Sequence, residues 1–280
     1  MKNTKKYIAI LLSVFVLIEL SLVFGAYDLD IWMKYGDAES KFGLTMEVLG
    51  ELVAPVMFAL SGMIIAIYYQ SQSDGEKRKH GKVYLGTIFI VAGLGYSIYV
   101  ITARGLNIYV SIGCLMVLAL FSIIMFSIIK KADANRLFQL YCIAVTTIMY
   151  CVAVLVVINI FKISWGRVRP RELSAHFAEF TTFYLPQGIN GNRSFPSGHT
   201  SNATILYVIT MFVPLVKKKI SKILLYVIPI IWIIVMAYSR VICGAHYASD
   251  VLYGATISII TFYVVKALAV RYIAKTLANE

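Results

Sequence analysis

Charged residues are scarce in this 280-residue sequence: they make up 14% of it, whereas 60% of the residues are hydrophobic. That balance excludes a large soluble domain and is typical of a polytopic membrane protein. Cysteines are also few, and their spacing matches no CxxC or other metal-ligand pattern: Cys114, Cys142, Cys151 and Cys243. The first three lie in apolar runs and are typical of small residues in membrane helices, so no disulfide is required. Internal repeats, low-complexity tracts and a second soluble region are absent, so residues 1–280 are predicted to form a single membrane domain.

Long apolar runs are what the chain has in abundance. About 20 apolar residues cross a bilayer as a helix. Pro55, Pro214 and Pro229 fall within such runs, where membrane helices tolerate proline as a kink. The fold class predicted is therefore all-α, a polytopic membrane helix bundle of about eight spans. The expected spans are 7–25, 50–69, 83–101, 107–129, 138–161, 200–216, 223–239 and 250–268.

The net charge of +12 would suggest nucleic acid as a partner in a soluble protein. Here the basic residues punctuate apolar runs, which favours membrane orientation and no nucleic acid. Most of them fall on one side if the N-terminus is inside, and the exceptions cluster around residues 162–193 and 240. The outer segment 26–50 contains Trp32 and several acidic residues. We expect it to be a short interfacial helix anchored by Trp32 that serves as a plain connector, with a lid as the alternative role.

Three segments carry the unusual polar residues, and the predicted topology places all of them at the outer face. They are residues 162–170, 193–200 and 239–250. Lys162, Arg169 and Arg240 supply three positive charges, and such side chains grip phosphate oxygens. Gly198 lets backbone amides approach an anion closely. The pattern therefore predicts a phosphate site.

Two histidines add reactive groups to this predicted site. His199 and His246 could divide the roles of nucleophile and acid. Asp250 follows His246 by four residues, so both would face one side of a helix and the carboxylate could hold the imidazole. No cluster of acidic residues is expected to hold a metal near these groups, because Asp250 is accounted for and Glu172 and Glu179 lie in the intervening loop. We therefore expect chemistry without a metal or other cofactor.

The three segments resemble the signature of the type 2 phosphatidic acid phosphatase superfamily of membrane lipid phosphatases. That signature is K-x6-RP, then PSGH, then SR-x5-H-x3-D, and every position of it is matched in order between residues 162 and 250. The resemblance implies a helical membrane core, here residues 138–268, with a metal-free site at its outer end. Residues 1–130 would add the N-terminal spans and the interfacial segment. One departure is that five spans precede the first motif here, where familiar bacterial members have three.

The resemblance also implies a role for each residue. His246 would be the nucleophile that forms a phosphohistidine, Asp250 would orient it, and His199 would protonate the leaving oxygen. The phosphate would be bound by five residues: Lys162, Arg169, Ser197, Gly198 and Arg240. Next to the second motif, Arg193 is a candidate for a secondary contact to a second phosphate or headgroup. Arg167 is expected to be a solvated neighbour.

These observations predict an enzyme that hydrolyses a lipid phosphate or diphosphate in a plasma membrane, with its site on the periplasmic or extracellular face. The substrates considered are undecaprenyl diphosphate, phosphatidic acid, phosphatidylglycerol phosphate and lipid A phosphates. Partners would be that lipid substrate and the membrane lipids. The alternatives are a lipid-linked phosphotransferase or, in a different class, a transporter that binds anions with its basic cluster. A transporter would not need His246 and Asp250 paired at helical spacing.

Overall fold

The computed structural model describes residues 2–72, 76–103 and 107–278, and these contain no strand. The prediction of an all-α protein is confirmed. The long helices in chain order are α1 (Lys2–Tyr35), α2 (Lys41–Glu51), α3 (Val53–Ser71), α4 (Glu76–Ala103), α5 (Ile108–Lys130), α6 (Ala134–Trp165), α8 (Lys219–Ile242) and α9 (Ala248–Ala278). Between α6 and α8 lie three shorter elements: η1 (Pro170–Glu172), α7 (Gly198–Thr204) and η2 (Ile205–Leu215).

Within the described residues, seven helices are long and apolar enough to cross a membrane. The predicted segment 200–216 is not one of them, because it is built from the short helix α7 and the 3-10 helix η2, with Pro214 inside η2. A 3-10 helix rises about 2.0 Å per residue, against about 1.5 Å for an α-helix. The two elements together therefore still reach across the bundle, as the other predicted spans do.

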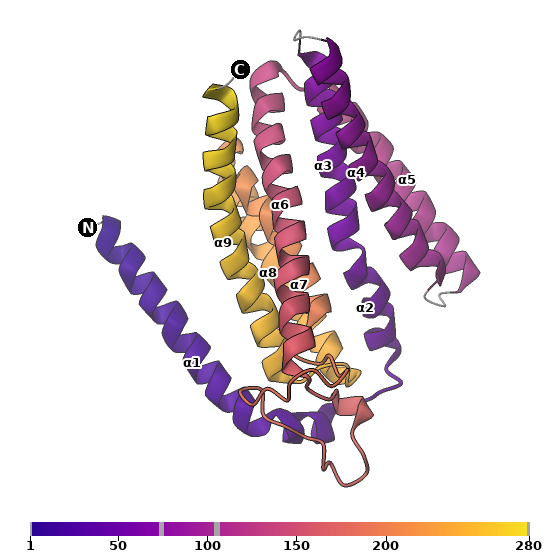
Figure 1. The fold of residues 1–280 in the computed structure, drawn as a ribbon, viewed down its shortest axis with the longest axis vertical. Helices are drawn as coiled ribbons and strands as arrows, with labels where there is room; N and C mark the ends of the chain where they lie inside the picture. Colours follow the sequence, from indigo (N-terminus) through magenta and orange to yellow (C-terminus); the bar gives the residue numbers. More distant parts are fainter. Residues whose placement is uncertain (1, 73–75, 104–106, 279–280) are drawn as a thin grey trace.

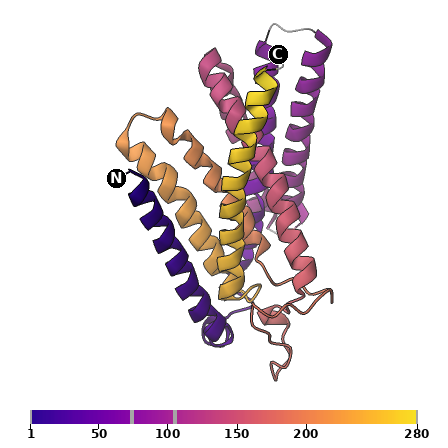
Figure 2. The same ribbon diagram turned by 60° about the vertical axis from the view of Figure 1, so that its left-hand side comes forward.

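The bundle has two ends of different character (Figure 1). At the lower end of the view, the far end of α1 meets the long connection between α6 and α7 and the turn between α8 and α9. The upper end holds the end of α3, the start of α4, the turn between α5 and α6, and the end of α9 (Figures 1 and 2). The chain thus brings all three motif-bearing segments to the same end.

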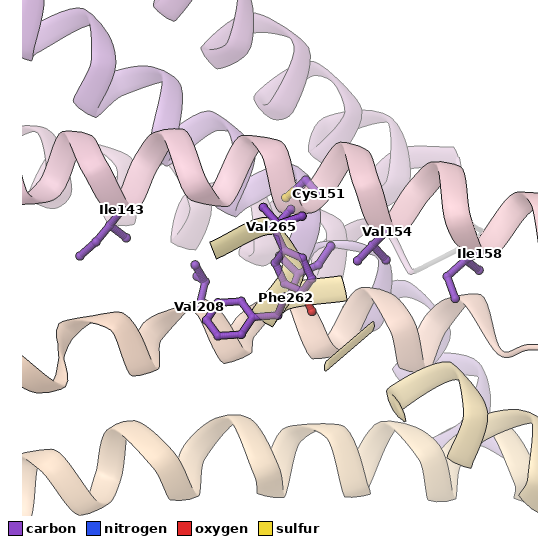
Figure 3. Packing of buried hydrophobic residues seen from close by; sticks show 9 residues of the cluster. Ile143, Cys151, Val154, Ile158, Val208, Phe262 and Val265 are labelled. Atoms are coloured by element: carbon purple, nitrogen blue, oxygen red, sulfur yellow. The ribbon is translucent and has the colours of Figure 1, made fainter. Parts of the chain in front are cut away.

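Helix α6 is the centre of the packing. Its buried residues Ile143, Cys151, Val154 and Ile158 recur at helical spacing and face η2 and α9, where Phe262 lies among them (Figure 3). A second cluster joins α6 to α3 and the end of α5. Helix α5 itself is largely exposed, as expected for a helix that faces lipid.

The outer segment 26–50 differs from the predicted interfacial helix. Helix α1 continues without a break to Tyr35, and α2 then leads directly into α3. Trp32 packs against the turn between α8 and α9, where a Cβ on Gly244 would collide with the indole ring. This segment therefore forms a wall of the end where the motifs meet, and the expectation of a plain connector is wrong.

Candidate functional site

The first motif begins in the last turn of α6 and continues into the chain that follows it. Lys162 lies in the last turn of the helix, and Gly166 ends it in the left-handed conformation with a φ of 64°. A side chain at that position would be strained, and its Cβ would also collide with the carbonyl of Gly188. The chain then turns through Arg169 into η1. Glycine at position 166 thus lets the chain turn sharply after α6, so that Lys162 and Arg169 both lie at the end of this helix.

His246 lies in the turn before α9, and Asp250 lies in the first turn of that helix. His246 Nδ1 is 3.7 Å from Asp250 Oδ2, and the two side chains are 3% and 0% exposed. This distance is longer than a hydrogen bond, although it puts Nδ1 toward the carboxylate and leaves Nε2 on the other side of the ring. The predicted neighbours are thus together, in a loose arrangement of the kind common in sites without substrate.

Asp250 is held by groups from three other parts of the chain. Ser194 Oγ donates to Asp250 Oδ2 at 2.6 Å, and the amide of Tyr247 donates to the same oxygen at 3.1 Å. The guanidinium of Arg167 donates to Oδ1 at 2.6 Å. Since Arg167 is completely buried, the expectation that it is a solvated neighbour is wrong.

Arg167 is itself balanced by a second carboxylate. Its Nη2 donates to Asp28 Oδ2 at 2.9 Å, and the Asp28 side chain is as inaccessible as that of Arg167. The amide of Ser249 donates to Asp28 Oδ1 at 2.9 Å, and its hydroxyl donates to Oδ2. Asp28 belongs to α1, so the first helix is tied by buried charges to the start of α9. Such groups are tolerated inside a protein only when paired and hydrogen-bonded.

The second motif forms the start of α7. The Ser197 hydroxyl accepts from the amide of Thr200 at 3.3 Å and so caps the helix, as serine commonly does. The Ser197 amide donates to the carbonyl of Asp250 at 2.9 Å, which joins the second motif to the third. His199 is two residues into the motif's helix, and its Nε2 lies 3.3 Å from Glu51 Oε1. The two atoms are within ion-pair distance, although they do not meet the full geometry of a hydrogen bond.

Arg240 ends α8 with its side chain entirely buried and turned toward α2. It donates through Nη1 to Glu47 Oε2 at 3.0 Å and through Nη2 to the carbonyl of Gly43. Two glutamates of α2 therefore contact predicted site residues, Glu47 at Arg240 and Glu51 at His199. Neither contact follows from the sequence prediction, which considers only Asp250, Glu172 and Glu179 as carboxylates near these groups.

Lys162, Arg169 and Gly198, three of the other predicted phosphate contacts, line one cavity with His199. Lys162 Nζ donates to the carbonyl of Arg193 at 2.9 Å. A Cβ added to Gly198 would lie 3.1 Å from Lys162 Cε, so the glycine permits the lysine to lie against α7. Arg169 pairs with Glu172 at 3.2 Å. The Arg193 side chain is exposed, and it is the backbone carbonyl of this residue that accepts from Lys162.

A cavity of about 600 Å³ opens from these groups into the bundle. Lys162, Arg169 and His199 line it at one end, with Gly198 and Glu51. The rest of its wall is mostly apolar and comes mainly from α3, α4 and α6, with smaller parts from α7 and η2. Among the apolar lining residues are Phe58, Tyr96, Val154, Leu155 and Ile158.

The pKa values of both histidines are lowered, which favours the neutral form of each imidazole. Burial above all, together with the nearby charge of Lys162, lowers the pKa of His246 to about 3, although Asp250 opposes the shift. Burial also lowers the pKa of His199 below its ordinary value of 6.5, with Glu51 acting in the opposite direction. At neutral pH His246 therefore carries a free lone pair on its unprotonated nitrogen.

Across the described ranges, no group of three or more histidine, cysteine or acidic side chains is arranged to hold a metal ion. Four residues at this end were missed by the sequence prediction: Asp28, Glu47, Glu51 and Arg167. Glu51 stands at the start of the apolar run 50–69 and Glu47 just before it, and an ionisable residue within a membrane segment is a signal for a site. For Asp28 no local pattern gives such a signal.

In a comparison with known protein families, residues 137–273 match the model of the PAP2 superfamily. This range contains all three motifs. Phosphatidylglycerophosphatase B of Bacillus subtilis (strain 168) is 37% identical over 78 residues, which are 26% of this chain and 37% of that relative's length. The match thus covers little more than a third of the relative. No solved structure matches the chain. The superfamily match and the long apolar helices together make this a multi-pass membrane protein.

Proposed function

Because residues 137–273 place the chain in the PAP2 superfamily, we propose that the protein is a membrane lipid phosphatase that hydrolyses a lipid phosphate or diphosphate without a metal ion. The observation that carries the proposal is the meeting of Lys162, Arg169 and His199 at the polar mouth of an apolar cavity. A lipid phosphate fits this arrangement, because its phosphate would lie at the polar mouth and its chain in the apolar cavity.

The phosphate would be gripped first. Lys162 and Arg169 supply charge from the α6 side, and Arg240 supplies it from the end of α8. Ser197 and Gly198 offer a hydroxyl and a backbone amide at the start of α7. Guanidinium and ammonium donors of this kind stabilise the charge that spreads over the phosphoryl oxygens during transfer.

His246 would then act as the nucleophile. Its Nδ1 faces Asp250, so Nε2 attacks phosphorus while the bond to the lipid oxygen breaks. Asp250 stabilises the imidazole as it becomes positively charged, and Arg167 holds Asp250 in place. His199 gives its proton to the leaving lipid oxygen. In the second step a water molecule attacks the phosphohistidine, His199 takes the proton from the water, and the electron pair of the P–N bond returns to His246.

The substrate is proposed to be a lipid because the leaving group would have to lie on the His199 side, where the apolar cavity begins. The name of the B. subtilis relative points to phosphatidylglycerol phosphate. Undecaprenyl diphosphate and phosphatidic acid carry the same combination of a phosphate and a long apolar chain. Most of the basic residues outside the motifs belong to segments at the opposite end of the bundle, among them Lys130, Lys217 and Lys275. Their position supports a site at the non-cytoplasmic face of the plasma membrane.

Phosphate release by the purified protein in detergent tests this proposal. The panel is phosphatidic acid, phosphatidylglycerol phosphate and undecaprenyl diphosphate, each with and without EDTA, with the His246→Ala variant as the control. Release that survives EDTA and disappears in the variant is expected. Absence of turnover on every lipid would reject hydrolysis, and loss of turnover in EDTA would reject a metal-free reaction. Transfer to an added alcohol in place of release would identify a phosphotransferase.

A further inference from the structure

Helix α2 places a carboxylate directly beside the predicted acid of the reaction. Glu51 Oε1 lies 3.3 Å from Nε2 of His199, and both side chains are largely buried, at 14% and 19% exposed. Both residues line the mouth of the apolar cavity. The charged and titratable groups that face His199 are Glu51 and Glu47 from α2, Arg240 from α8, and His246 from the turn before α9.

The backbone around Glu51 is fixed to α7 by Asn202, which follows His199 by one turn of the helix. Pro55 has no amide hydrogen, so the carbonyl of Glu51 lacks its normal partner four residues later. Asn202 Nδ2 donates to this carbonyl at 3.3 Å, and Asn202 Oδ1 accepts from the amide of Ala54 at 2.9 Å. The Asn202 side chain thus pairs the free backbone groups at the break between α2 and α3. It also holds Glu51 against α7, the helix that carries His199.

Small residues let α2 lie close enough for this contact. A Cβ on Gly43 would collide with Cys243, and one on Gly50 would collide with the end of the Met236 side chain. Both neighbours belong to the end of α8 or the residue after it. Close approach at these two glycines brings Glu47 to Arg240 and Glu51 to His199.

We propose that Glu51 is a positioning residue for proton transfer to the leaving group, a role that rests on the proposed function. Its carboxylate holds the Nε2–H of the His199 imidazolium, so that Nδ1–H is presented to the lipid oxygen. As the P–O bond breaks, the Nδ1 proton goes to that oxygen and Nε2–H stays with Glu51. In the second step Nδ1 takes a proton from the attacking water. The carboxylate also opposes the lowering of the His199 pKa by burial.

The test uses two substrates that differ in their need for an acid. The leaving group of a short-chain phosphatidic acid is an alkoxide, which needs a proton. The leaving group of para-nitrophenyl phosphate is a phenolate, which is stable without one. General acid catalysis contributes about 10²- to 10⁴-fold. Glu51→Gln should therefore lower kcat on the lipid by about 100-fold, with a loss on the aryl phosphate at least about tenfold smaller. The alkaline limb of kcat/KM on the lipid should move to lower pH, and Glu51→Asp should restore part of the rate.

Glu47→Gln is the matched control, because Glu47 lies one helical turn before Glu51 and contacts Arg240 instead of His199. It should raise KM for both substrates alike. Equal losses on lipid and aryl phosphate in Glu51→Gln, with an unmoved pH profile, would overturn the positioning role. So would full activity of this variant on the lipid. Failure of the wild type to release phosphate from any lipid would instead reject the proposed function itself.

Discussion

The two histidines at this end of the bundle each lie beside a carboxylate, but the chain brings the two pairs together in different ways. His246 and Asp250 are separated by four residues around the start of α9, whereas His199 and Glu51 come from helices far apart in the sequence. The ring orientations also differ, since Nδ1 of His246 and Nε2 of His199 face their carboxylates. A pair within one helical turn can be predicted from spacing, but a pair made by helix packing requires the fold.

The surroundings of the two pairs differ as well. His246 is enclosed, and its carboxylate is fixed by a buried arginine, whereas His199 opens onto the apolar cavity. The proposed roles account for this contrast. A nucleophile benefits from a dry, rigid setting in which its lone pair stays free. The acid must stand where a bulky leaving group can enter and depart.

The largest expected effect comes from removing the nucleophile. His246→Ala should lower phosphate release from lipid and aryl substrates by at least about 1000-fold, because no covalent intermediate can form. The measurement is initial rate in detergent, with gel filtration to check folding. His199→Ala should lose much more on the lipid than on the aryl phosphate. If the two variants lose the same amount on both substrates, the division of roles between the two histidines is wrong.

The second-largest effect is expected at Arg167, which distinguishes the two histidine–carboxylate pairs. It donates to Asp250, whereas no such arginine is described beside Glu51. Arg167→Met leaves Asp28 and Asp250 buried without their cation, which should cost about 3 to 5 kcal/mol of stability. The shift of the thermal unfolding midpoint in detergent measures this cost. Arg171→Met is the control, since Arg171 is exposed nearby. Adding Asp28→Asn to Arg167→Met should recover part of the loss, and a midpoint equal to that of the control would contradict the ion-pair network.

The pH dependence of activity should reflect both imidazoles. His246 must be neutral, and its pKa of about 3 keeps it so through most of the acid range. His199 must be protonated, and burial lowers its pKa below 6.5, so kcat/KM on a lipid should fall about tenfold per pH unit above that lowered value. The profile in detergent should thus have an acidic optimum. An alkaline limb that begins above the ordinary histidine range would contradict this assignment.

Stability should move in the opposite direction. Both histidines have folded pKa values below their unfolded ones, so the folded protein binds fewer protons. Their contribution to stability is complete above the unfolded value of 6.5 and is lost as pH falls toward the folded values. The unfolding midpoint in detergent should therefore decline through the range in which activity rises. A midpoint that increases on acidification would contradict the direction of both shifts.

The sequence was sufficient for the helical bundle and for the meeting of the three motifs, because both depend on apolar runs and local order. It failed where tertiary neighbours decide. Arg167 was expected in solvent, but two carboxylates from α1 and α9 enclose it. The acidic residues Asp28, Glu47 and Glu51 were assigned to a connector or not considered, since nothing in their local pattern shows which helix they will face. Segment 200–216 was predicted as an ordinary span, although much of it is a 3-10 helix.

The smallest expected effect is at Arg193, the one candidate contact whose side chain is exposed. Its carbonyl accepts from Lys162, and Arg193→Ala keeps that bond. Exposed ion pairs contribute about 0.2 to 1 kcal/mol, which limits the rise in KM to about fivefold. If the side chain reaches a second phosphate, this rise should appear with a diphosphate lipid and not with a monophosphate, and it should shrink in high salt. Equal KM values for wild type and variant on both lipids would confine phosphate recognition to the buried groups around the two histidines.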